Sequence, residues 1–168
     1  MTIRKIEAKD NLRVAEIIRE CLIEYGCEGK MDTAWGDPYL ERFSEVYVLE
    51  NNSYWVAEND QGLVVAGVGI GPLCDESSTC ELQKMYCVQE YRGCGIAQEL
   101  LDTALEFAKQ HYKRCYLETR HNMDRAKRFY ERNGFVYIDE TIGCTGHGGC
   151  DYHYIKDLVM DYSGKSGF

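Results

Sequence analysis

The sequence predicts a single mixed α/β domain, and three observations lead to that prediction. The chain has 168 residues, of which 45% are apolar and 12% aromatic, so it can bury a core without disulfides or metals. Two segments, 14–25 and 96–108, repeat apolar residues with the period of a helix. Shorter β-rich runs alternate with them, without a repeat or linker. We therefore expect residues 1–168 to form one domain, with 163–168 as a flexible tail.

The N-terminal third predicts a short strand followed by two helices. Ile3 and Ile6 indicate the strand, although their alternation is weak. The first helix has Asp10 or Asn11 as its cap. Its apolar stripe consists of Val14, Ile17, Ile18, Cys21, Leu22 and Tyr25. Asp37 followed by Pro38 has the pattern of a cap with proline at the first helical position, so we expect a second helix ending near Leu49.

The middle of the chain predicts a β-hairpin and a third strand. Residues 54–58 and 63–70 are β-rich, and the four residues between them, Asn59 to Gly62, are typical of a tight turn. The second run is apolar enough to be buried on both faces. Its alternating glycines begin like a dinucleotide-binding fingerprint, but Pro72 stands where the third glycine should be. A loop over 72–78 should lead to a strand over 80–88.

Helices and strands alternate again in the C-terminal half. A Gly-rich turn leads into a long helix, whose apolar stripe is Ile96, Leu100, Leu101, Ala104, Leu105 and Ala108. A strand over 114–119 precedes a helix that Asn122 caps and Asn133-Gly134 ends. Strands over 135–139 and 152–160 close the chain around a loop rich in glycine.

Charge and hydropathy exclude two classes of partner. Nineteen Lys and Arg against 28 Asp and Glu give a net charge of −9, which repels nucleic acid. The longest apolar stretch, 63–70, is interrupted by glycines and is under half a membrane span. Charges at short intervals in residues 1–9 leave no segment of signal-peptide length. We expect a cytoplasmic protein whose nine cysteines are reduced thiols.

The Gly-rich turn has the chemistry of an anion cradle. It consists of Arg92, Gly93, Cys94, Gly95, Ile96 and Ala97. Unpaired amides at the start of the following helix converge there, and two glycines allow a phosphate to approach closely. The helix dipole favours negative charge, and Arg92 adds a positive charge nearby. A plain strand-to-helix turn is the alternative for so short a motif.

The surroundings of this turn resemble the GNAT superfamily of N-acetyltransferases. Arg92-x-x-Gly95-x-Ala97 is similar to its pyrophosphate-binding signature, Gln/Arg-x-x-Gly-x-Gly/Ala. Residues 81–87 resemble its fourth strand, and residues 129–135 resemble its helix-to-strand segment ending in Gly-Phe. The predicted order of strands and helices also agrees along the chain. The resemblance implies the GNAT fold, with one twisted, mostly antiparallel sheet of about seven strands flanked by about four helices.

The resemblance implies acetyl-CoA as co-substrate and direct attack of an amine on the thioester. That chemistry needs a base for an ammonium of pKa about 10 and a hydrogen bond to a departing thiolate of pKa about 8.5. Tyr130 matches the family's general acid, and Glu81 is the candidate base, directly or through water. Tyr130 can equally pack in the core, and Glu81 at a strand start can be solvated.

The remaining cofactor contacts are also implied by the resemblance. The backbone of Met85 and Cys87 is expected along the pantetheine arm, with the Cys87 amide at the thioester carbonyl. Period-two alternation would put Glu81, Met85 and Cys87 on one face. Asn122 matches a cofactor-binding position in the family as well as a helix cap.

The acceptor side is less well defined by the sequence. An acidic protein attracts cationic acceptors, which fits a small-molecule or peptide amine. The resemblance assigns Trp35 and Tyr39 to one wall of the acceptor site and His147 to a loop beside it, although both aromatic residues can equally belong to the core. Dimers are frequent in families of this kind, which leaves a homodimer open.

Two other functions stay open. The first is a metal-binding or redox-sensing module, because Cys144, His147, Cys150 and His153 recur every three residues and are competent zinc ligands. We assign no metal, because His153 falls in an expected strand and structural zinc sites usually have paired short spacings. The second is a CoA sensor without turnover, against which Tyr130 and the intact turn both argue.

Overall fold

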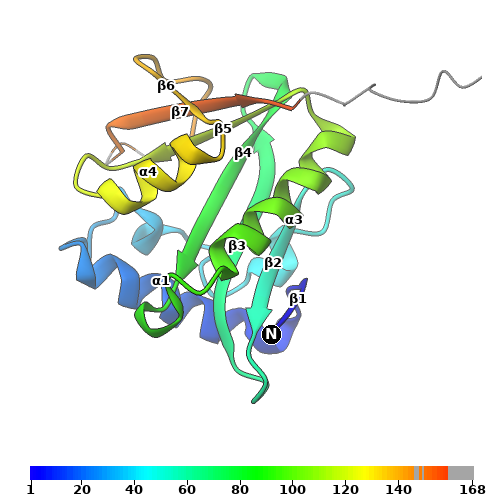
Figure 1. The fold of residues 1–168 in the computed structure, drawn as a ribbon, viewed down its shortest axis with the longest axis vertical. Coiled ribbons are helices and arrows are strands. Elements are labelled where there is room, and N and C mark those ends of the chain that lie inside the picture. Colours follow the sequence, from blue (N-terminus) through cyan, green and yellow to red (C-terminus); the bar gives the residue numbers. More distant parts are fainter. Residues whose placement is uncertain (146–147, 149, 159–168) are drawn as a thin grey trace, which may run out of the picture.

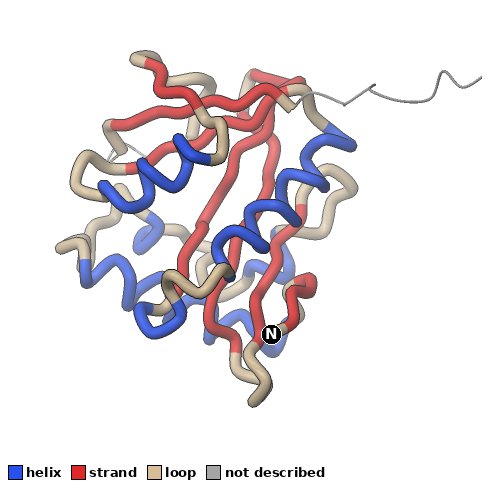
Figure 2. Tube along the Cα trace, viewed as in Figure 1, coloured by secondary structure: helices blue, strands red, loops and turns tan. Residues whose placement is uncertain are grey.

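A seven-stranded sheet forms the centre of the molecule, in the order β1-β2-β3-β4-β5-β7-β6. The computed structural model describes residues 1–145, 148 and 150–158. The strands are β1 (Thr2–Lys5), β2 (Ser53–Glu58), β3 (Val64–Leu73), β4 (Glu76–Cys87), β5 (Arg114–Thr119), β6 (Val136–Ile138) and β7 (Tyr152–Asp157). Neighbouring strands are antiparallel except β4 and β5, which are parallel, so the expected mostly antiparallel sheet is confirmed. Figure 2 shows the strands in red among the helices in blue.

Helices cover both faces of this sheet. They are α1 (Asn11–Glu24), α2 (Phe43–Val46), α3 (Ile96–His111) and α4 (Asp124–Arg132). In Figure 1, α3 and α4 lie in front of the sheet and α1 lies behind it. Every residue of the two predicted apolar stripes is buried except Tyr25, which is half-buried. Among the described residues, no helix is long and apolar enough to cross a membrane.

The prediction of a long second helix after Asp37 is wrong. The Asp37 backbone is extended, and its Oδ1 accepts the Tyr39 N–H at 2.8 Å, so the Asp-Pro pair forms a turn. Its other carboxylate oxygen lies 3.3 Å from Lys84 Nζ on β4. Only a 3-10 helix (Ala34–Gly36) and the single turn of α2 are helical in this segment. The capping pattern therefore marks an Asx turn that a tertiary ion pair holds in place.

The β2–β3 hairpin is confirmed, and the burial of β3 follows the prediction. Asn59 Oδ1 accepts the N–H groups of Gln61 (3.0 Å) and Leu63 (2.9 Å), which stabilises the turn. A Cβ at Gly67 would lie 2.7 Å from the Tyr54 ring, and a Cβ at Gly69 would lie 2.8 Å from the Tyr47 hydroxyl. The alternating glycines thus make room for aromatic side chains on a buried strand.

The expected loop over 72–78 is wrong, because both strands run further. β3 continues to Leu73 and β4 starts at Glu76, which leaves only Cys74 and Asp75 between them. Asp75 has a φ of 63°, in the left-handed region that tight hairpin turns use and that Asp tolerates. Pro72 fits within β3 opposite Cys80, where its side chain is exposed.

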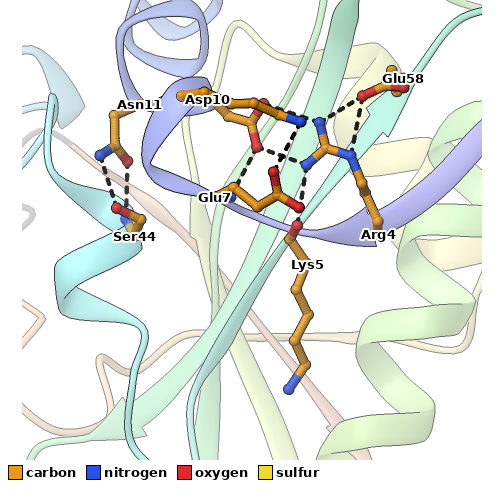
Figure 3. A network of polar contacts seen from close by, with 8 residues as sticks. Arg4, Lys5, Glu7, Asp10, Asn11, Ser44 and Glu58 are labelled. Atoms are coloured by element: carbon orange, nitrogen blue, oxygen red, sulfur yellow. Dashed lines mark hydrogen bonds and ion pairs between the residues drawn. The ribbon is translucent and has the colours of Figure 1, made fainter. Parts of the chain in front are cut away.

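A polar network joins the N-terminal strand to the hairpin (Figure 3). Arg4 pairs with Asp10 at 2.7 Å and donates from Nε to Glu58 at 3.0 Å. Asp10 is 4% exposed and also accepts the Glu7 N–H at 2.8 Å. Beside it, Asn11 Oδ1 accepts the Ser44 N–H at 2.9 Å, which ties α1 to α2. Arg4 is therefore the principal counter-charge of a buried carboxylate.

We expect Arg4→Met to lower the free energy of unfolding by about 2–3 kcal/mol, because it leaves Asp10 buried without its charge partner. Burial alone would raise the pKa of Asp10, but hydrogen bonds from Arg4 and the Glu7 amide lower it. The pair thus stabilises the fold above the unfolded-state pKa of Asp10, and the effect fades as the pH falls. Urea denaturation at neutral and acidic pH measures both. Arg42→Met, which breaks an exposed ion pair with Glu45, is the control and should change stability little.

Candidate active site

A cleft opens where β4 and β5 diverge. The two strands pair only from Thr79 with Arg114 to Glu81 with Tyr116, and then separate (Figure 1). The cleft has a volume of about 180 Å³. Its lining includes Cys21, Leu22 and Tyr25 from the α1 end, residues 81–87 of β4, residues 117–120 at the end of β5 and directly after it, and Ala126 and Tyr130 of α4. Because both α1 and α4 contribute, the cleft reaches both faces of the sheet.

A β-bulge in β4 shapes the wall of this cleft. Gly69 pairs with Gln83 and Gly67 pairs with Tyr86, so Lys84 and Met85 both stand opposite one residue of β3. Lys84 has a φ of 50°, and its carbonyl accepts the Tyr54 hydroxyl at 2.9 Å. The extra residue shifts the alternation of β4 by one.

The prediction that Glu81 and Cys87 share a face is therefore wrong. Glu81 stands opposite Gly71, whereas Cys87 stands opposite Ala66, which faces the other way. The Val88 N–H bonds the Val65 carbonyl at 3.0 Å. Because successive residues of a strand present their N–H groups to opposite sides, the Cys87 N–H points away from β3, toward the side on which β5 has diverged. The bulge thus leaves a backbone donor on the cleft.

Glu81 is a buried carboxylate on the cleft, held by a chain of two hydrogen bonds. Tyr47 donates to Gln83 Oε1 at 2.7 Å, and Gln83 Nε2 donates to Glu81 Oε2 at 2.7 Å. Glu81 is 5% exposed, and this burial raises its pKa to about 7, with the Glu118 charge adding to the rise. A carboxylate with this pKa can both accept and release a proton near neutral pH.

Tyr130 reaches the cleft from α4, on the opposite face of the sheet from α1. Its ring packs edge-on against Phe129 and Phe135, with centroids 5.6 and 5.8 Å away. Tyr130 is buried, with only 9% of its surface exposed, yet its hydroxyl has no hydrogen-bond partner among the described residues. Burial raises the pKa of this phenol above its usual range, so it stays protonated and can donate a hydrogen bond.

The cleft also contains three thiols, none of which has the environment of a nucleophile. Burial raises the pKa of Cys87 to about 11 and that of Cys150 to about 12. Burial raises the pKa of Cys21 as well, despite Arg92 nearby. A catalytic cysteine needs a lowered pKa, because the thiolate is the reactive form. These residues therefore do not support a covalent acyl-cysteine intermediate.

The Gly-rich turn lies at the N-terminus of α3. Gly93 and Gly95 have φ values of 79° and 92°, and a Cβ at either would meet no atom within 4 Å. Side chains are thus absent from an open surface where the first amides of a 16-residue helix lack helical acceptors. This is the geometry of an anion cradle.

Arg92 is placed differently from the expectation of a free charge beside that cradle. Its Nε donates to the Cys87 carbonyl at 2.8 Å, and its two terminal nitrogens pair with Glu24 of α1 at 2.7 and 3.0 Å. Its charge is therefore shared with a carboxylate. The side chain joins the turn, β4 and α1, and so holds the cradle in position relative to the bulge.

A family model for the acetyltransferase (GNAT) domain matches residues 50–137, which include β4, the turn and Tyr130. The chain belongs to the GNAT acetyltransferase family. It is 41% identical to the uncharacterized N-acetyltransferase YjgM of Escherichia coli K12 over 92% of the chain and 93% of that protein. Two solved structures share the fold. A GNAT acetyltransferase from Staphylococcus aureus Mu50 has a TM-score of 0.82 at 23% identity, over 94% and 99% of the two chains. The putative acetyltransferase yncA from Salmonella typhimurium, with its cofactor acetyl-CoA, has a TM-score of 0.74 at 17% identity, over 99% of each chain.

GNAT acetyltransferases use acetyl-CoA as co-substrate, and the residues of this chain suit that molecule. The open turn at Gly93 and Gly95 can receive a pyrophosphate, since no side chain or backbone atom fills the space. The divergence of β4 from β5 leaves an unpaired strand edge from Leu82 to Cys87 for the amide-bearing pantetheine arm. Bound there, acetyl-CoA supplies an activated acetyl thioester.

Several predicted site residues lie outside the cleft lining. Trp35 packs half-buried against the core and Tyr39 is 52% exposed, whereas Thr33 and Ala34 of the same segment line the cleft. Asn122 is exposed, and its prediction as the cap of α4 is wrong: the helix begins at Asp124, after a turn closed by the Met123 N–H on the Arg120 carbonyl. His147 lies outside the described residues.

The predicted Cys/His series does not assemble into one cluster in the part of the chain that the structure describes. Cys150 lines the cleft, His153 stacks on Tyr116, and Cys144 is exposed beside Cys74 and Asp75. A spacing of three residues would gather ligands on one face of a helix. β7 is extended from Tyr152, however, so His153 is part of the sheet and its side chain packs on Tyr116 of β5.

Glu118 and Arg120 line the cleft and were missed by the sequence analysis. Glu118 accepts the Tyr116 hydroxyl at 2.8 Å and the Thr145 hydroxyl at 2.8 Å, and its side chain is 3% exposed. The sequence carried a signal: Glu118 is a charged residue within a strand whose neighbours are buried, which is unusual, and Arg120 comes directly after that strand. Only the divergence of β4 from β5 explains where these charges point.

Proposed function

We propose that this enzyme transfers the acetyl group of acetyl-CoA to the amine of a small molecule or peptide, by direct attack of the amine on the thioester. The observation that carries the proposal is the placement of Glu81 and Tyr130 in one cleft. A buried carboxylate with a pKa of about 7 enters it from the sheet, and a protonated phenol enters it from α4. Two titratable groups with their pKa values separated in this way suit a base and an acid.

Each proposed role follows from the contacts of the residue. Glu81, oriented by Gln83, accepts a proton from the acceptor ammonium, directly or through water. The Cys87 N–H, facing the cleft, donates to the carbonyl oxygen as negative charge develops on it. The Tyr130 hydroxyl donates to the departing sulfur. The backbone from Met85 to Cys87 aligns the pantetheine arm, and Gly93, Cys94, Gly95, Ile96 and Ala97 hold the pyrophosphate.

Amine-dependent release of CoA thiol, measured against pH, tests this proposal. We expect kcat/KM to rise with pH and to level off above an apparent pKa of about 7, because Glu81 must lose its proton to act as a base. Glu81→Gln should remove this inflection and lower kcat/KM about tenfold at pH 8, where water still deprotonates part of an amine of pKa about 10. Glu76→Gln, on the far end of the same strand, should leave the profile unchanged. A Glu81→Gln profile identical to that of the wild type would exclude Glu81 as the base.

The same assay separates turnover from a CoA sensor. If acetyl-CoA binds in calorimetry but no amine in a broad panel releases the thiol, the sensor is favoured over the enzyme. The compartment we propose is the cytoplasm, where thiols are kept reduced. The nine free cysteines of the chain suit such an environment.

A further inference from the structure

The charges around the cleft differ in whether they have partners. Lys84 pairs with Asp37 at 3.3 Å, and Arg92 pairs with Glu24 at 2.7 Å. Of the basic side chains that line the described cleft, only Arg120 forms no ion pair and no hydrogen bond with any described residue. One cation of the cleft is therefore available to a ligand.

Arg120 is also partly withdrawn from water. Its Nε is buried and has no hydrogen-bond partner among the described residues. A guanidinium donor buried without an acceptor is costly, and proteins usually satisfy such a group. A bound anion would satisfy it, and the planar guanidinium matches a carboxylate through two parallel hydrogen bonds.

The position of Arg120 places it on the acceptor side. It comes directly after Thr119, the last residue of β5, and lines the cleft together with Glu81 and Glu118. The charges of all three residues act on the pKa of the Cys150 thiol, so their side chains lie around the same part of the cleft.

Glu118 and Tyr116 project from the same face of β5 by alternation, and Tyr116 pairs with Glu81 of β4. Gln83, which bonds Glu81, also bonds Tyr47 next to α2, so this face is the one that α2 covers. Tyr130 belongs to α4, which lies with α3 on the opposite side of the sheet from α1 (Figure 1). Arg120 thus lies near the proposed base, on the face of the sheet away from α3. The pyrophosphate cradle is at the N-terminus of α3, on the other face.

We propose that the acceptor is an amino acid, a small amine that also carries a carboxylate, and that Arg120 binds this carboxylate. The inference rests on the proposed function and specifies its substrate class. The ammonium of such a molecule would face Glu81 and Glu118, while its carboxylate would face Arg120. A polyamine would instead bring further positive charge to an unpaired guanidinium, and a simple alkyl amine would leave the buried Nε unsatisfied.

Matched pairs of acceptors test this directly. The probes are the proteinogenic L-amino acids and several ω-amino acids, each compared with its primary amide and its decarboxylated amine, with CoA thiol release as the readout. For wild type we expect kcat/KM at least about tenfold higher for the best amino acid than for its two counterparts that lack the carboxylate, as loss of a charged hydrogen bond predicts.

Variants at Arg120 test whether this residue binds the carboxylate of the acceptor. We expect Arg120→Gln to raise the KM for the amino acid at least about tenfold and to leave the KM for its amide unchanged. The variant should therefore no longer prefer the amino acid over the amide. The KM for acetyl-CoA should not change. Arg120→Lys should retain part of the preference for the carboxylate. Arg125 is an exposed arginine on α4 outside the cleft lining, so the control variant Arg125→Gln should keep the full preference of the wild type.

Three results would overturn the inference, and they have different meanings. Better turnover of decarboxylated amines or polyamines than of every amino acid would reject the substrate class while supporting an N-acetyltransferase. An increase in the acetyl-CoA KM of Arg120→Gln, with the acceptor KM unchanged, would assign Arg120 to the cofactor. No thiol release with any amine or amino acid would contradict the proposed function itself.

Discussion

Tyr130→Phe is expected to lower kcat by about 10²-fold or more, because it removes the hydroxyl proposed to stabilise the departing thiolate. The ring keeps its contacts with Phe129 and Phe135, and the lost hydroxyl has no partner among the described residues. Acetyl-CoA affinity and thermal stability should therefore change little. Steady-state rates at saturating acceptor, measured where chemistry limits turnover, give the answer together with melting curves.

Tyr112→Phe is the matched control for this experiment. Tyr112 is buried to a similar extent, lies outside the cleft lining, and donates to the Asn51 carbonyl at 2.7 Å. Its loss should cost about 1 kcal/mol of stability and leave kcat unchanged. The two variants thus have opposite expected effects. A loss of turnover below about threefold in Tyr130→Phe would remove this residue from the mechanism.

Gly95→Val is expected to weaken acetyl-CoA binding at least about 10²-fold, because its side chain fills the space in which a pyrophosphate meets the first amides of α3. A Cβ there meets no protein atom within 4 Å, so the obstruction would act on the ligand and not on the core. The positive φ of 92° adds about 1–2 kcal/mol of backbone strain, which the melting temperature will register. Calorimetric titration with CoA measures the affinity.

Gly62→Val separates that strain from obstruction of the cradle. Gly62 has a φ of 78°, has equally open space at its Cβ, and lies in the β2–β3 turn outside the cleft lining. It should lose similar stability and bind CoA normally. Equal CoA affinity in Gly95→Val and wild type would show that the pyrophosphate does not lie at this turn.

The placement of Arg92 changes how the cradle attracts an anion. With its guanidinium on Glu24 and the Cys87 carbonyl, the attraction depends on backbone amides and the dipole of α3. These donors need no side-chain rearrangement when a ligand binds. The same contact leaves the Cys87 carbonyl occupied and its N–H facing the cleft, so a single side chain connects the pyrophosphate end of the site to its reacting end.

Local patterns were sufficient where the physical cause is local. The apolar stripes of α1 and α3 are buried as the 3.6-residue period predicts, and the β2–β3 turn forms because Asn59 bonds its own neighbours. Asp37-Pro38 misled because an Asx turn and a helix cap use the same side-chain hydrogen bond, and the ion pair with Lys84, far along the chain, decides between them.

By itself the sequence determined the element order, the buried stripes, the Gly-rich turn, and Tyr130 and Glu81 as candidate acid and base. Only the tertiary structure decided which side chains meet. The bulge at Lys84 shifts the alternation of β4, and the early end of the β4–β5 pairing exposes Glu118 and Arg120 to the cleft. Periodicity reports which side of its own element a residue occupies. The register between strands depends on contacts between residues distant in sequence, and these become visible only once the chain is folded.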